Sequence, residues 1–94
     1  MNIGSSIKKI RKARSLSQGD LSDLSGISRT GLSKIENGDA VPTQKNLKKI
    51  SDALKVTPQL VYILAIDRDD VPDNKKVLFD ALLPSFQNLA EQIL

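Results

Sequence analysis

Apolar side chains recur at helical spacing through the first two thirds of the chain. Ile3, Ile7 and Ile10 lie four and three residues apart, which predicts a helix from Ile3 to near Ser15. Further apolar stripes follow, and each begins just after a Ser or Thr that is suited to capping a helix. No segment alternates with a period of two for long, so we expect an all-α fold. Four more helices are predicted, of which the first two cover 18–25 and 29–37. The next is capped by Thr43, and its inward residues are Leu47, Ile50, Ala53 and Leu54. The last is capped by Thr57 and starts at Pro58, and its apolar residues are Leu60, Val61, Ile63 and Leu64.

The second and third predicted helices are short and are joined by a tight turn. Leu21 and Leu24 give the second helix an apolar face, and Gly26 suits left-handed backbone at its end. Leu32 and Ile35 face inward from the third helix, and a loop over 39–42 follows it. This order of short helix, turn and short helix between residues 18 and 37 is the layout of a helix-turn-helix.

The last third of the chain has a different composition. An acidic stretch at 67–70 marks a predicted boundary between a domain over 1–66 and a helical extension over 67–94. We expect helical stretches at 73–83 and 84–93, with Pro84 either kinking one helix or starting a second. The extension is acidic and amphipathic, and we interpret it as a possible dimerisation element; the alternative is a lid packed on its own domain. Its aspartates lack the Gly and the Glu of a calcium loop, so we expect a solvated linker.

Composition excludes several functions. The chain has 94 residues and no Cys, His or Trp, which excludes Cys/His zinc sites and nucleophiles activated by His. We therefore expect no enzyme, no metal and no cofactor. No apolar run could span a bilayer and no secretory signal is evident, so the expectation is a soluble, cytoplasmic protein.

Charge is distributed unevenly along the chain. Residues 1–66 carry eleven Lys or Arg against five Asp or Glu, whereas 67–94 carry three against six. A basic first part is typical of a protein that binds a polyanion, although an ordinary solvated surface is the alternative. The first helix contributes cations that would add long-range attraction: Lys8, Lys9, Lys12 and Arg14.

Several sequence fragments, in matching order and spacing, resemble the Xre and lambdoid phage repressor–Cro family. They are IKKIRK in the first helix, LSQ before the second, SGIS at the turn, LSKIENG at the end of the third, and then VPT and LKVTPQL. The resemblance covers Ile3 to about Ile66 and implies a five-helix repressor-like domain. In that family the third helix enters the major groove of DNA.

The resemblance implies base contacts from Arg29, Thr30, Ser33 and Lys34 on the outer side of the third helix. Arg can bond guanine O6 and N7 together, and Thr can donate a hydrogen bond or touch a thymine methyl. Solubilising charge on an exposed helix is the alternative for Arg29 and Lys34.

The resemblance also implies phosphate contacts from Gln18, Asn37 and Lys45. The alternatives are a first-turn polar residue for Gln18 and a helix stop for Asn37. Arg11 and Glu36 are implied to form a buried ion pair between the first and third helices, which would be structural.

Two residues depart from the family pattern. Ser22 replaces the usual Ala, and its hydroxyl could bond back to the carbonyls of its own helix. Gly31 lies inside the third helix at a cost of about 1 kcal/mol relative to Ala and leaves a spot that DNA or another helix could approach.

The resulting prediction is a sequence-specific transcriptional regulator that binds double-stranded DNA. It would act as a repressor and as a homodimer on a palindromic operator, in a bacterial or phage setting. The alternatives are an antitoxin-type protein with a toxin partner and a protein-interaction module that retains only the fold.

Overall fold

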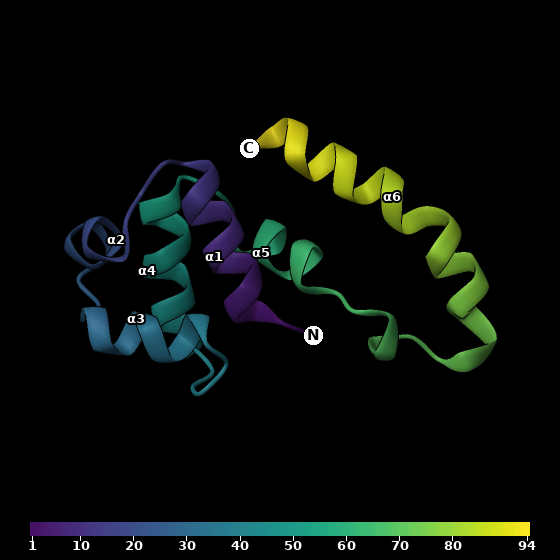
Figure 1. Ribbon diagram of the computed structural model, residues 1–94, viewed down its shortest axis with the longest axis horizontal. Helices are drawn as coiled ribbons and strands as arrows, with labels where there is room; N and C mark the ends of the chain where they lie inside the picture. Colours follow the sequence, from purple (N-terminus) through teal and green to yellow (C-terminus); the bar gives the residue numbers. More distant parts are fainter.

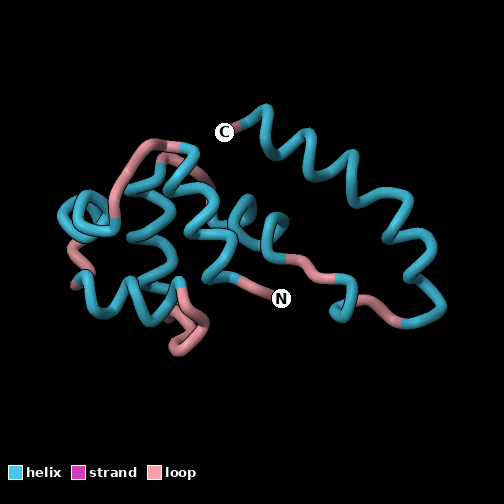
Figure 2. Tube along the Cα trace, in the orientation of Figure 1, coloured by secondary structure: helices cyan, strands magenta, loops and turns pink.

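The computed structural model describes residues 1–94, and all of its regular secondary structure is helical, which confirms the expected fold class (Figure 1; Figure 2). Five helices form a compact cluster, and a sixth, longer helix lies beside it. Between α5 and α6 the chain makes two short 3₁₀ turns, at Arg68–Asp70 and Asp73–Lys75. The α-helices are α1 Ile3–Ala13, α2 Gln18–Ser25, α3 Arg29–Glu36, α4 Gln44–Leu54, α5 Pro58–Ala65 and α6 Lys76–Ile93.

Side-chain caps fix where the early helices begin. Ser17, Ser28 and Thr43 each accept a hydrogen bond from the backbone N–H three residues on, as their positions in the sequence predicted. Thr57 makes no such bond, so at α5 the prediction of a side-chain cap was wrong; Pro58 still occupies the first turn. Gly26 ends α2 with a φ of 75°, the left-handed backbone that glycine adopts without strain.

The core lies where α1 meets the other helices. Ile7 and Ile10 of α1 are fully buried, and the core around them takes one to three aliphatic residues from each of α2 to α5. Two expected inward residues are not inside: Leu24 is 61% exposed and Ile63 is 43% exposed. Leu24 lies on the solvent side of the short α2, whereas Ile63 faces α6 rather than the core.

Two small residues let α1 approach its neighbours closely. Gly4 lies against the backbone carbonyl of Ile35 at the end of α3, where a Cβ atom would clash with that oxygen. Ser6 is buried, and its hydroxyl donates to the carbonyl of Val61 at 2.7 Å. These contacts hold α3 and α5 against α1 and so fix the orientation of α3.

The C-terminal extension is a single long helix rather than two stretches. The 3₁₀ turn at Asp73–Lys75 leads directly into α6, which begins at Lys76 and continues through Pro84. Of the two alternatives at Pro84, the structure has one helix that continues past the proline and not a second helix that starts there. Its ribbon bends part-way along (Figure 1), which is the behaviour expected of a helix that contains a proline. None of the helices combines the length and the apolar character that spanning a bilayer requires.

Candidate nucleic-acid interface

The turn between α2 and α3 is stabilised by side-chain bonds to its backbone. The Ser22 hydroxyl donates to the carbonyl of Ile27 at 2.6 Å, across the turn. The expectation that Ser22 would bond back into its own helix was therefore wrong. The N–H of Ile27 donates to the Ser25 hydroxyl. Both bonds hold α3 at a fixed angle to α2.

α3 has one buried face and one open face. Leu32, Ile35 and Glu36 are buried against the rest of the domain. Arg29, Thr30 and Lys34 of the same helix are exposed, and Ser33 is half-buried. Neither Arg29 nor Lys34 takes part in any salt bridge. The open face therefore presents two cations without counter-charges, together with hydroxyl groups.

Arg29 bends back over the start of α2. A Cβ atom placed on Gly19 would lie 3.6 Å from the Arg29 Cζ atom and 3.7 Å from its Nε atom. These are ordinary van der Waals distances, so a side chain as small as that of alanine would fit at Gly19 beside the guanidinium. This contact brings the first residue of α3 close to the first turn of α2.

A buried ion pair joins α1 to α3 behind this surface. Arg11 Nε donates to Glu36 Oε2 at 2.8 Å, and Arg11 Nη2 donates to Glu36 Oε1 at 2.9 Å. The remaining Arg11 nitrogen, Nη1, donates to the carbonyl of Leu16 at 2.7 Å. The Glu36 side chain is 1% exposed and that of Arg11 is 9% exposed. This bidentate geometry is well suited to holding two helices in register.

The three residues implied to contact phosphate are placed differently. Gln18 is half-buried, and its Nε2 donates to Glu36 Oε1 at 3.3 Å, so it is linked to the ion pair. Asn37 is exposed at the end of α3, with its side chain 3.5 Å from the Ser33 hydroxyl. Lys45 is exposed in the first turn of α4 and makes no salt bridge.

Two of the four cations expected on the basic face of the first helix, Lys9 and Arg14, are engaged with α6 or with the residue that follows it. Lys9 forms a salt bridge with Glu91 at 3.0 Å. Arg14 donates to the carbonyls of Leu54 and Leu94. Lys8 and Lys12 are exposed and take part in no salt bridge. The basic face expected on α1 is therefore partly used to hold the last helix.

Two residues that position this surface were not identified from the sequence. Gly4 and Ser6 set the approach of α1 to α3 and α5. A signal was available for Gly4 and Ser6, because each is a small residue that lies between the large aliphatic residues of the first helical stripe.

The sequence profile of the helix-turn-helix family matches residues 7–61, which span α2, the turn and α3. The chain belongs to this helix-turn-helix family. The resemblance to Xre and lambdoid repressors is thereby confirmed.

Named relatives of this helix-turn-helix chain include proteins of phage and of bacteria. It is 40% identical over 57 residues to the cryptic phage CTXphi transcriptional repressor RstR of Vibrio cholerae, covering 61% of this chain and 51% of RstR. It is 38% identical over 56 residues to the HTH-type transcriptional repressor RghR of Bacillus subtilis, covering 58% and 42%. It is 43% identical over 49 residues to the ImmF control region 10 kDa protein of Bacillus phage phi105, covering 52% and 54%. The chain spans about half the length of these curated relatives.

Proposed function

We propose that the chain is a sequence-specific transcriptional regulator that binds double-stranded DNA and acts as a repressor. The observation that carries the proposal is the open face of α3, where Arg29 and Lys34 have no counter-charges while the opposite face is held rigidly by the core. Membership of the helix-turn-helix family and the names of the relatives support the same function.

Direct readout would depend on the outer side chains of α3. An α-helix fits the major groove, where Arg29 would bond guanine O6 and N7 together and Lys34 would bond one acceptor. Thr30 and Ser33 would supply hydroxyl groups for bases. One bidentate pair contributes roughly 1–3 kcal/mol of discrimination between bases.

Phosphate contacts would fix the position of α3 on the duplex. Gln18, Asn37 and Lys45 lie at the start of α2, just after α3 and at the start of α4. Contacts to phosphate set the register of a protein on DNA without reading its sequence. Neutralising phosphates also releases counterions, which makes the affinity depend on salt.

The proposed mode of repression is occupation of an operator by a homodimer. One domain of this size reads only a few base pairs, and two domains on half-sites about 34–36 Å apart would multiply the specificity. A palindromic operator would match the twofold symmetry of such a dimer. Bound across a promoter, the dimer would exclude polymerase without any catalytic step.

An antitoxin-type function is the second candidate, and one observation favours it. The outer surface of α6 exposes large apolar side chains, and such surfaces mark sites of protein interaction. A toxin could bind there while α3 binds DNA, so this function would add a partner to the same fold. Purifying the chain with and without the protein encoded by the neighbouring gene would distinguish the antitoxin function from the repressor function.

To test DNA binding, the affinity for a labelled random-sequence duplex is measured at increasing salt concentrations, with fluorescence anisotropy as the readout. We expect the logarithm of the binding constant to fall linearly with the logarithm of salt concentration. Lys45→Ala should lower the magnitude of that slope by about one. Lys75→Ala removes the same charge from the extension and should leave the slope nearly unchanged. Retention of no duplex even at very low salt would contradict the proposal.

A further inference from the structure

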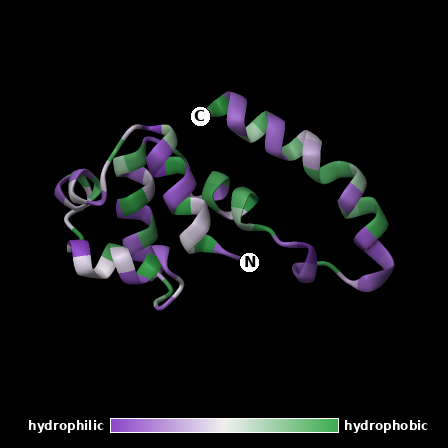
Figure 3. Cartoon of the chain, viewed as in Figure 1, coloured by the Kyte–Doolittle hydropathy of each residue, from purple (hydrophilic) through white to green (hydrophobic).

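The exposed side of α6 carries a stripe of large apolar side chains. In this structure they are all 44% exposed or more, although they are as large as the residues of the core. Figure 3 shows the alternation of apolar and polar residues along this helix. The stripe residues are spaced by three or four positions, which places them on one side of the helix: Leu78, Leu82, Phe86, Leu89 and Ile93.

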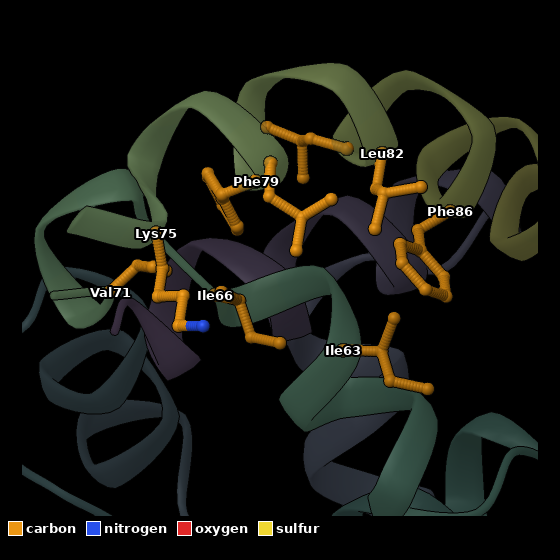
Figure 4. A pocket seen from close by; sticks show the side chains of 9 residues that line it. Ile63, Ile66, Val71, Lys75, Phe79, Leu82 and Phe86 are labelled. Carbon is orange, nitrogen blue, oxygen red and sulfur yellow. The ribbon is translucent and has the colours of Figure 1, made fainter. Parts of the chain in front are cut away.

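One end of the stripe borders a hollow. An apolar hollow of about 520 Å³ lies between α5 and α6, and Leu78, Leu82 and Phe86 form part of its wall. Ile63 and Ile66 form the opposite wall, and Figure 4 shows the side chains of Ile63, Leu82 and Phe86 pointing toward this space. No side chain of the chain itself fills the hollow.

The side chains at the other end of the stripe are exposed and do not line this hollow. Leu89 and Ile93 are 56% and 60% exposed, and neither lines this hollow, although Ile93 borders a smaller one beside Leu60 and Ile63. α6 therefore borders an apolar hollow along its first half and exposes two large apolar side chains along its second half.

An antiparallel second copy of α6 would bring the second half of its stripe against the first half of this one. With the twofold axis between Ser85 and Phe86, each residue faces the residue of the second copy whose number is 171 minus its own. Leu82 then faces Leu89 of the second copy, and Leu78 faces Ile93 of the second copy. Phe86 faces Ser85 of the second copy, a small residue that leaves room for the ring. Such self-complementarity is what a twofold interface requires.

We propose that a second copy of this chain occupies the hollow, with Leu89 and Ile93 of its antiparallel α6 seated between α5 and α6. The pairing rests on the dimeric mode of action proposed above and specifies its surface. Because Lys9 and Arg14 attach α6 to the first domain, the pairing would also fix how the two α3 helices are held relative to each other.

Cysteine pairing in the full-length chain tests the arrangement, because the natural chain has no Cys. Leu82→Cys and Leu89→Cys are prepared separately, and each is oxidised alone and after mixing, without DNA. We expect efficient disulfide-linked dimers only in the mixture, since like cysteines would lie seven residues, or about 10 Å, apart along the helices. Val77→Cys mixed with Leu89→Cys is the matched control, because Val77 is exposed on another side of α6.

Sedimentation of the unmodified chain and of Leu89→Asp provides the second readout. A dimer that becomes a monomer on this substitution, but not on Val77→Asp, supports the proposal. A monomeric natural chain, which would leave the surface to a different protein, overturns it. Disulfides within either single variant would indicate parallel pairing and also overturn it. Duplex binding at low salt, measured on the same samples, distinguishes failure of the pairing from failure of DNA binding.

Discussion

Gly4 of α1 lies directly against the backbone carbonyl of Ile35 in α3, with no room between them for a side chain. The contact is between two backbones, so neither partner can move aside by changing a rotamer. It occurs next to Glu36, the residue that pairs with Arg11. Together these two contacts determine how α3 is held by the domain.

We expect Gly4→Ala to destabilise the domain. In an unconstrained helix Ala would be favoured over Gly by about 1 kcal/mol. Here the added methyl group would force α1 and α3 apart, and such overpacking costs about 1–3 kcal/mol, so the steric effect should decide the sign. Urea unfolding followed by circular dichroism measures the change. Ser5→Ala, at the exposed neighbouring position, should alter the free energy of unfolding by less than about 0.5 kcal/mol. Equal effects of the two changes would contradict this role of Gly4.

Removal of one partner of the buried ion pair should have a large effect. Glu36→Ala would leave the Arg11 guanidinium buried without its carboxylate, and we expect a loss of about 3–5 kcal/mol in the free energy of unfolding. The exposed pair of Lys48 and Asp52 is the internal comparison, because Asp52→Ala should cost no more than about 0.5 kcal/mol. Similar losses from both changes would show that burial of the pair is unimportant.

The start of α2 should respond to pH through Asp20. The backbone N–H of Ser17 donates to the Asp20 carboxylate at 2.9 Å, and this bond, with that to the Ser17 side chain, holds the pKa of Asp20 below its ordinary value of 3.8. A carboxylate whose pKa is lowered by folding stabilises the folded state above the ordinary pKa, and this contribution is lost as pH falls through the lowered pKa. NMR titration of the Asp20 carboxyl should give a value under 3.8, and Asp20→Asn should destabilise the domain at pH 7 more than at pH 2. A midpoint at or above the ordinary value would contradict the capping box.

Pro84 should weaken α6. Proline lacks the N–H that would bond to the carbonyl of Asp80, and its ring crowds the preceding turn, at a cost of about 3 kcal/mol in a helix interior. We therefore expect Pro84→Ala to slow hydrogen exchange in the middle of α6 and to raise helicity. Gln87→Ala, at an exposed position of the same helix, should leave exchange nearly unchanged. Faster exchange in Pro84→Ala would contradict this account and would indicate that the bend is needed for packing.

The sequence predicted most of the first domain because its signals were local. Caps at Ser17, Ser28 and Thr43 and the turn at Gly26 depend on residues within one or two helical turns. The stripes of aliphatic residues likewise predicted most of the core, apart from Leu24 and Ile63. Leu24 could not be placed because a helix of eight residues has too few turns to define its buried side.

The features that the sequence did not predict depend on contacts between distant residues. The closeness of Gly4 to Ile35 and of Gly19 to Arg29 follows from how helices cross, which no local pattern specifies. At Pro84 the sequence left open whether one helix kinks or a second helix begins, and the structure has one helix that continues past the proline. The assignments of Arg29, Thr30, Ser33 and Lys34 to bases, and of Gln18, Asn37 and Lys45 to phosphates, remain predictions.

Selection of bound sequences from a random duplex library, with the natural chain and with Arg29→Ala, tests the central claim most directly. The natural chain should enrich a palindromic motif, and Arg29→Ala should lose preference for guanine at one position of each half-site, by roughly 1–3 kcal/mol. Lys48→Ala, on an exposed part of α4, should select the same motif as the natural chain. Enrichment of the unchanged motif by Arg29→Ala, with undiminished preference at every position, would contradict the claim that α3 reads the bases through this residue.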